Sequence, residues 1–161
     1  MADSLLRVAM AASNNGYHTK LTDSAASAAI PATTMTATPM NTVVYDPMSM
    51  NSTAGAVGSI TCKVDGYYIA AMRTSYSGVI DGTILLSDIW VNRQGAGMAE
   101  TVRGYYICSG GVQVAILPAC ALLKLLAGDA VEGVIYTTTG ASTTAAVATL
   151  NTIELVFVGP A

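Results

Sequence analysis

Charge is scarce in this sequence. Charged residues make up 11% of its 161 residues and hydrophobic residues 52%, whereas an average soluble domain carries about 25% charged residues. So few charges leave little to cover the surface of a monomer. We therefore expect a large share of the apolar surface to face other subunits.

Clustered cations and long apolar runs are also missing. The net charge is −3 and the Lys and Arg residues form no cluster, so the sequence does not favour binding to nucleic acid, which requires clustered cations to neutralise phosphates. No apolar run approaches the roughly 18 residues of a membrane span. The N-terminal apolar patch contains Asp3 and Arg7, unlike a secretory signal. We expect neither a membrane nor a nucleic-acid partner, and assembly in a cytoplasm.

Residue types that serve metal sites and catalysis are few and dispersed. The three cysteines, Cys62, Cys108 and Cys120, form no Cys-x-x-Cys pair, which predicts free and mostly buried thiols, with one disulfide plus a free thiol as the alternative. The single histidine, His18, is far from all three in sequence, so a zinc site is not expected. No Gly-x-Ser-x-Gly, Walker or Gly-x-Gly-x-x-Gly motif occurs. We predict no enzymatic activity, no catalytic residue and no cofactor.

Four aspartates stand beside expected turns or strand ends: Asp65, Asp81, Asp88 and Asp129. Their spacing matches no EF-hand loop. We interpret them as aspartates whose carboxylates hydrogen-bond within turns, with a calcium site on a loop as the alternative.

The first 42 residues differ in composition from the rest. Ser24 to Thr38 is nearly all Ala, Ser and Thr, and Pro31 and Pro39 act as breakers. Such a segment has little to bury and cannot offset its own ordering entropy. We predict an extended arm over residues 1–42 that orders on a neighbouring molecule, with a solvated tail as the alternative. The predicted contacts of the arm are Leu5, Leu6, Val8, Met10, Tyr17, Leu21 and Ile30.

Residues 43–161 show the pattern of a β domain. Short strands alternate with turn signals about every ten residues, which predicts an all-β sandwich. Leu122 to Tyr136 is the clearest hairpin, with a Gly128-Asp129 turn, although its leucines also fit one helical turn. Ala96 to Val102 is expected to be an exposed loop, and Pro118 to mark an edge or a bulge. The last strand, Leu150 to Val158, has apolar residues on both faces, which indicates burial on both sides or a subunit contact.

Four motifs in this order resemble one jelly-roll superfamily, that of the complement first-component globular heads and the tumour-necrosis-factor ligands. They are Asp65-Gly66-Tyr67-Tyr68-Ile69, Ile89-Trp90-Val91-Asn92-Arg93, Leu122 to Val131, and Ile153-Glu154-Leu155-Val156-Phe157-Val158-Gly159. Together they span about residues 43 to 160. The sequence departs from the family pattern at Ile69, where Phe is usual, and at Arg93, where Gly usually follows the Asn.

The resemblance implies a ten-stranded jelly roll that assembles as a homotrimer. Aromatic and aliphatic residues line the three-fold axis in that family, and the candidates for this interface are Tyr67, Tyr68, Tyr136 and Phe157. A homotrimer agrees with the separate inference from the low charge.

These features together favour a viral structural protein. Secreted members of the family often follow a signal and a collagen stalk, and neither pattern is present. We predict a bacteriophage capsid decoration (cement) protein that is assembled in the host cytoplasm and located on the capsid surface of the virion. Its arm would bind the major capsid protein and tie neighbouring subunits together. The alternative is a receptor-binding tip of a phage fibre, with binding loops at Gly95 to Arg103 and Thr137 to Ala148.

Overall fold

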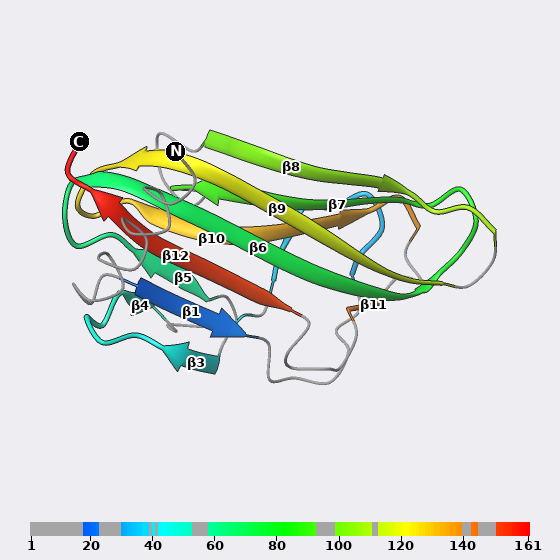
Figure 1. Cartoon of the computed structure of the whole chain (residues 1–161). Coiled ribbons are helices and arrows are strands. Elements are labelled where there is room, and N and C mark those ends of the chain that lie inside the picture. The colour runs from blue at the N-terminus through cyan, green and yellow to red at the C-terminus, as the bar shows by residue number, and fades with distance from the viewer. Residues whose placement is uncertain are drawn as a thin grey trace, which may run out of the picture.

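The fold is a sandwich of two antiparallel sheets (Figure 1). The computed structural model describes residues 18–22, 30–38, 40, 42–52, 58–92, 99–110, 113–139, 143–144 and 151–161. These residues contain twelve strands and no helix, so none of them forms a helix that would cross a membrane. The all-β sandwich predicted from the turn spacing is confirmed.

Sheet A has six strands, with β9, β6, β12, β1 and β3 side by side in that order. The short strand β11 pairs with the distal end of β6. Its strands are β1 (His18–Thr22), β3 (Thr42–Tyr45), β6 (Gly66–Val79), β9 (Gln113–Leu125), β11 (Thr143–Thr144) and β12 (Thr152–Gly159).

Sheet B also has six strands, in the order β4, β5, β10, β7, β8, with β2 beside the second half of β10. Its strands are β2 (Thr36–Ala37), β4 (Asn51–Ser52), β5 (Ser59–Thr61), β7 (Ile84–Val91), β8 (Ala99–Ile107) and β10 (Ala130–Thr137). In the Leu122 to Tyr136 segment the two strands and the turn between them are confirmed, but the predicted hairpin is wrong. Strand β9 pairs with β6 in sheet A and β10 pairs with β5 and β7 in sheet B, so the turn carries the chain from one sheet to the other.

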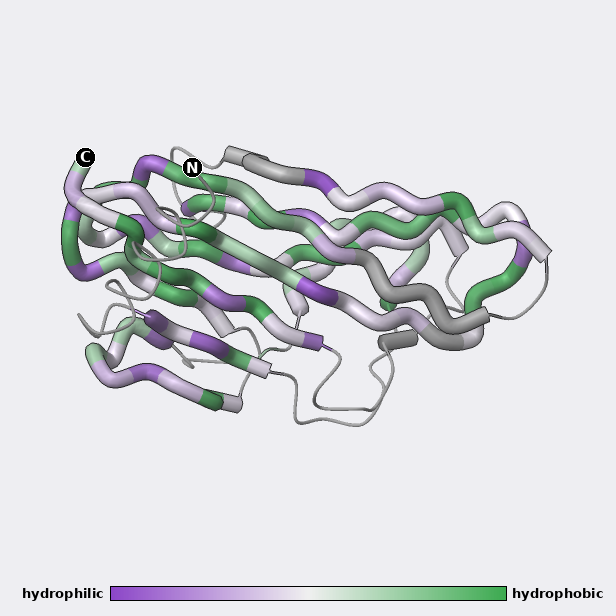
Figure 2. Tube along the Cα trace, in the orientation of Figure 1, coloured by the Kyte–Doolittle hydropathy of each residue, from purple (hydrophilic) through white to green (hydrophobic). Residues whose placement is uncertain are grey.

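The core lies between the sheets, where alternate side chains of each strand meet. On β12, Ile153 and Leu155 are fully buried, whereas Glu154 and Val156 face outward and are half-buried. The outward face of β12 is therefore not fully buried within one chain, and Figure 2 shows apolar positions along these central strands. The edge strands β8 of sheet B and β9 of sheet A approach each other closely. A Cβ at Gly104 of β8 would lie 2.6 Å from the carbonyl oxygen of Pro118 on β9, so only glycine fits there.

The predicted arm boundary after residue 42 is wrong for the described part of that segment. Strand β1 lies between β12 and β3, with Leu21 opposite Ile153. Leu21, Ile30 and Met40 are 0%, 1% and 0% exposed and belong to the core. Residues 18–22, 30–38 and 40 therefore contribute to the sandwich, because their few large apolar side chains fill the space between the sheets. Residues 1–17 lie outside the described residues.

One local prediction also needs correction, and the prediction that Pro118 marks an edge is confirmed. Strand β8 begins at Ala99, so residues 99–102 are strand rather than loop. Strand β9 continues through Pro118 to Leu125; it is an edge strand, where proline is tolerated because its missing N–H faces away from the ladder. The described residues form twelve strands rather than the expected ten, and three of these contain two residues each.

Candidate interaction surface

The outward surface of sheet B, called face B, is formed by alternate residues of β7, β10 and β8. Its central side chains are buried although they point away from the core between the sheets. Asp88 and Val134 are 0% exposed, and Glu132 and Leu86 are 4% and 6% exposed. The centre of face B is therefore covered within its own chain, whereas Tyr105 and Ile107 of β8, which alternate with Arg103 on the same face, are exposed.

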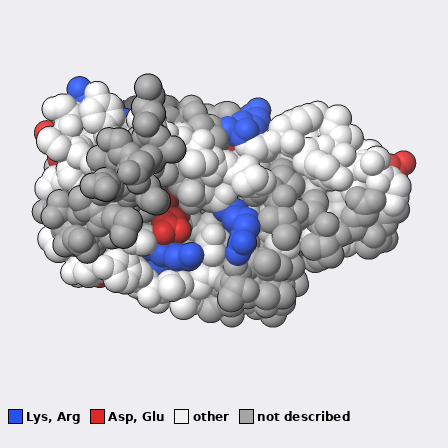
Figure 3. Space-filling view, viewed as in Figure 1, with Lys and Arg blue, Asp and Glu red and all other residues white. Residues whose placement is uncertain are grey.

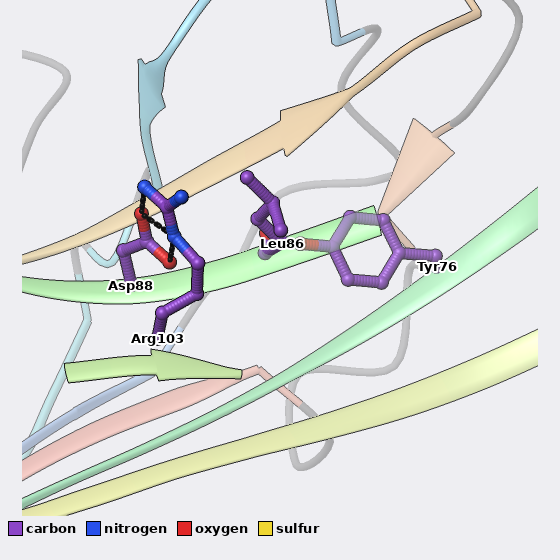
Figure 4. Close-up of polar contacts among 4 residues, drawn as sticks. All are labelled: Tyr76, Leu86, Asp88 and Arg103. Carbon is purple, nitrogen blue, oxygen red and sulfur yellow. Dashed lines mark hydrogen bonds and ion pairs between the residues drawn. The ribbon is translucent and has the colours of Figure 1, made fainter. Parts of the chain in front are cut away.

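An ion pair holds the middle of face B (Figure 4). Nη2 of Arg103 on β8 lies 3.1 Å from Oδ2 of Asp88 on β7, and Nε lies 3.3 Å from both carboxylate oxygens. Because the carboxylate is buried, it depends on this partner. From the core side, the hydroxyl of Tyr76 donates to the carbonyl of Leu86. Its burial raises the pKa of Tyr76, so the hydroxyl stays protonated and keeps donating.

The outward surface of sheet A, called face A, has a different character. Leu122 on β9 is 64% exposed and Tyr67 on β6 is 39% exposed. Ile69 on β6 is paired in register with Val156 on β12, and both side chains are half-buried. Figure 3 views this side, where uncharged atoms surround a small number of blue and red groups near the centre. We call Tyr67, Ile69, Leu122 and Val156 the apolar strip of face A.

A small polar cluster borders the apolar strip on β1 and β12. Nε2 of His18 lies 2.5 Å from Oε1 of Glu154, and Nζ of Lys20 lies 3.7 Å from Oε2 of the same carboxylate. The His18 ring lies 5.0 Å from the ring of Tyr45 on β3. The side chains of His18, Glu154 and Lys20 are 21% to 36% exposed, so the contacts among them contribute little to stability and mainly set the polar boundary of the strip.

A second exposed apolar region lies at the end of the sandwich formed by β8 and the turn between β6 and β7 (Figure 1). Tyr105, Tyr106 and Ile107 are 57%, 38% and 51% exposed, and Ile80 is 46% exposed. Three consecutive exposed side chains of this size are unusual on a strand of a monomer, because one of its faces normally packs inward. We call these four residues the end patch.

A third exposed apolar region is formed by β3 and the turn that follows it. Val43, Val44 and Tyr45 are 43%, 56% and 42% exposed, and Met48 is 40% exposed. We call these residues the β3 patch.

Asp46 fixes the turn after β3. Its carboxylate accepts hydrogen bonds from Thr19 Oγ1 at 2.8 Å, from the Met50 N–H at 2.8 Å and from the Asn51 N–H at 2.9 Å. Burial alone would raise the pKa of Asp46, but these hydrogen bonds outweigh it and lower the pKa below the usual value of 3.8. The β3 patch is therefore held in place by an ionised carboxylate.

The turn aspartates behave largely as predicted. Carboxylates of Asp65, Asp81 and Asp129 accept backbone N–H groups of Ala127, Gly110 and Leu126, each at 2.8 Å. Asp88 is the exception, because it lies in the middle of β7 and pairs with Arg103. Within the described ranges no three His, Cys, Asp or Glu side chains are grouped to hold a metal ion.

All three cysteines are free thiols; Cys62 and Cys108 are buried. Burial, helped by the negative charge of Asp129, raises the pKa of Cys62 to about 12, so this thiol is unreactive at neutral pH. Cys120 is exposed and lies on β9 two residues before Leu122, on face A. The prediction of free, mostly buried thiols is confirmed, with Cys120 as the accessible one.

The predicted interface aromatics are spread over different environments. Tyr67 lies in the apolar strip of face A, as an interface residue would. Tyr68 is 0% exposed and packs edge-on against Phe157 at a centroid distance of 5.3 Å, so its prediction as an interface residue is wrong because its ring fills the core of one protomer. Tyr136 is half-buried on face B. The structure therefore does not bring the four together.

The predicted arm contacts are similarly divided. Leu21 and Ile30 are core residues, and their prediction as capsid contacts is wrong because these side chains are enclosed by their own chain. Leu5, Leu6, Val8, Met10 and Tyr17 lie outside the described residues. The sequence reasoning missed Leu122, the end patch and the β3 patch. For Leu122 a signal existed, because on a strand it shares a face with Lys124, whose charge favours exposure.

Comparisons with known proteins find similarity at the level of structure. No family model and no curated protein sequence matches the chain. The Eiger TNF of S. frugiperda superposes with a TM-score of 0.65 at 14% identity, over 89% of this chain and 93% of that one. The globular domain of zebrafish complement 1qA gives 0.60 at 16% identity, over 89% and 98%. Murine APRIL gives 0.60 at 13% identity, over 87% and 98%. The chain thus has the jelly-roll fold of the TNF and complement C1q domains.

Proposed function

We propose that the chain forms a homotrimer that decorates the outer surface of a bacteriophage virion and binds the major capsid protein there. The observation that carries the proposal is the apolar strip of face A, in which Leu122 is 64% exposed on a molecule with only 11% charged residues. A surface of this kind fits contact with other subunits.

The placement of the exposed apolar regions supports a closed ring of three copies. A three-fold ring needs two different surfaces on each protomer, because each copy contacts one neighbour with one surface and the other neighbour with another. The apolar strip of face A and the end patch are two such surfaces. We infer that the end patch of one protomer packs near the apolar strip of the next.

The composition of the N-terminal residues supports the capsid contact. Leu5, Leu6, Val8, Met10 and Tyr17 are large apolar or aromatic residues in the segment that leads into β1. Three copies of this segment on one trimer would act together, so that each contact is weak and the whole attachment is strong. Ordering each segment costs entropy, which the burial of its apolar side chains offsets.

Two deletions test this proposal. Deleting residues 2–16 should leave a folded trimer that no longer co-sediments with empty shells, because β1 begins at His18. Deleting residues 2–40 should instead prevent folding, because it also removes the core residues Leu21, Ile30 and Met40. Circular dichroism and light scattering measure the fold and the mass. Undiminished shell binding by the shorter deletion would contradict the capsid contact.

The end patch favours a second candidate function, the receptor-binding tip of a phage fibre. Tyr105 and Tyr106 are exposed aromatic side chains, which commonly stack on sugars or fill interface pockets. If this function is correct, the two tyrosines stay accessible in the assembled protein and bind a host glycan or protein. Nitration of exposed tyrosines in the trimer distinguishes the two, because packing against a neighbour protects both rings.

A further inference from the structure

The β3 patch is the exposed apolar region that the proposed trimer contacts do not use. Strand β3 forms the edge of sheet A and, among the described residues, pairs only with β1. Residues 42–45 contain no charge, although charged side chains are a common protection of strand edges. A short strand, a register shift opposite Lys20 and Leu21 and the following Pro47 limit backbone pairing there. The exposed side chains remain available for packing.

The patch is rigid enough to act as a docking surface. Asp46 bonds Thr19 of β1 at 2.8 Å and the backbone of residues 50 and 51 at 2.8 and 2.9 Å. These contacts hold the end of β3 to β1 on one side and to the start of β4 on the other. A partner therefore meets a preorganised surface and does not have to order it first.

The chain that precedes β1 enters beside this patch. His18 is the first residue of β1, and its ring lies 5.0 Å from that of Tyr45. The outer side of β3 is about two strand spacings from β1, or roughly 10 Å. Seven residues separate Met10 from His18 and span up to about 23 Å when extended. They include Asn14-Asn15-Gly16, a sequence that favours a reversal of the chain.

We propose that the segment Leu5–Met10 docks on the β3 patch of its own chain. The segment has four large apolar side chains and one charge, Arg7, and it matches an uncharged patch of four large apolar residues. Attachment through a short linker gives the segment a high effective concentration at this patch. The docked segment covers Val44 and Tyr45 and is itself kept from solvent.

The proposal gives the free protein a way to store its capsid-binding residues. The docking stands on the geometry of β3 and its neighbours, and only the later transfer of the segment to a shell rests on the proposed function. A shell would then compete with the β3 patch for Leu5, Leu6, Val8 and Met10. Storage of this kind also limits self-association through exposed apolar segments.

Disulfide trapping in the full chain tests the docking. In a Cys120→Ser background, Leu6→Cys is combined with Val44→Cys, and in the matched control with Ile107→Cys, a residue of similar exposure at the other edge (51% against 56%). After mild oxidation, peptide mass spectrometry should find an intrachain link between residues 6 and 44 and none in the control. A link formed between chains would overturn the proposal in favour of exchange between copies. Equal trapping with residues 44 and 107, or none with residue 44, would also overturn it.

A second measurement does not depend on forming a new disulfide. In the same Cys120→Ser background, deleting residues 2–16 should increase the thiol-labelling rate at position 44 of the Val44→Cys variant by about tenfold and leave the Ile107→Cys variant unchanged. An unchanged rate at position 44 would contradict docking. Loss of shell binding by the deletion, measured separately, reports on the proposed function. The two ideas can thus fail independently.

Discussion

The two outward faces of the sandwich differ in how far their central side chains are buried and paired within the chain. On face B the central residues Asp88 and Val134 are 0% exposed, and Asp88 has its ion-pair partner on the neighbouring strand. On face A, Leu122 and Tyr67 remain 64% and 39% exposed in an apolar strip whose charged neighbours, such as Lys124 opposite Tyr67, lie at its border. Both sheets have six strands and the same alternation, so the sheet architecture does not cause the difference.

The difference separates stability from association. A buried carboxylate with an arginine partner is needed for one protomer to fold, because loss of the partner leaves a charge without compensation. An exposed leucine and tyrosine do nothing for the protomer and are available to another molecule. Substitutions on face B should therefore change unfolding, and substitutions on face A should change the assembly.

The largest expected effect is on face B. Arg103→Ala should lower the free energy of unfolding by about 3 kcal/mol, because the carboxylate of Asp88 stays buried without its partner. The Arg103 side chain is 39% exposed, which places the loss at the lower end of the range for buried pairs. Lys124→Ala, an exposed cation on face A, is the control and should stay within about 0.5 kcal/mol of the unchanged protein. Urea denaturation measures the free energy of unfolding of both variants. Equal losses in Arg103→Ala and Lys124→Ala would contradict the proposed difference between face B and face A.

On face A, Leu122→Glu should weaken association by about a hundredfold or more, because each protomer would bring an unpaired charge into an apolar contact. The melting behaviour of the protomer should change little. Leu126→Glu is the matched control, since Leu126 is similarly exposed at 56% but lies in the turn beyond β9. Analytical ultracentrifugation gives the masses. Association that survives Leu122→Glu would mean that the strip is not a contact.

Thiol labelling of Cys120 should report on the same face. Cys120 should react about ten times more slowly in the assembled protein than in Leu122→Glu, because packing on face A covers it. Cys62 should not react in either protein until unfolding, since its pKa is raised to about 12 by burial. Mass spectrometry after alkylation identifies the labelled residue. Equal rates at Cys120 would argue that face A stays open.

The smallest expected effect concerns the acid dependence of the turn after β3. The pKa of Asp46 is lowered in the folded protein from 3.8, so the stabilisation from its ionised form is present above that value and is lost as the pH falls through the folded pKa. Asp46→Asn should cost about 1 kcal/mol at neutral pH and should flatten the loss of stability as the pH falls below 3.8. An unaltered acid profile would show that Asp46 does not contribute.

Local pattern was enough to predict much of the fold. Leu122 to Tyr136 carries its own turn signal, and the alternation at Ile153, Glu154, Leu155 and Val156 predicts the faces of β12, because both depend on neighbours in sequence. Leu21 was misassigned because its partner, Ile153, is more than a hundred residues away, and no local pattern indicates such a pairing. The start of β8 at Ala99 was missed because Ala99-Glu100-Thr101 has little strand character.

The candidate surface was less predictable than the fold. Tyr67 and Tyr68 are adjacent aromatic residues of one strand, so they point to opposite faces of the sheet. A shift of the strand by one residue would exchange which tyrosine is exposed and which fills the core, and the sequence alone does not fix that choice. Asp88 was taken for an aspartate beside a turn or strand end because its partner Arg103 belongs to another strand. Exposure on edge strands, as at Val44 or Tyr105, depends on which strands find neighbours, and only the assembled sheets define that.

The mass of the intact protein in solution tests the central claim most directly, namely that face A is an interface between copies of this chain. Sedimentation equilibrium at low micromolar concentration should give three times the chain mass of 16.4 kDa, and Leu122→Glu should give the chain mass itself. A single chain mass for the unchanged protein over the whole concentration range would contradict the account.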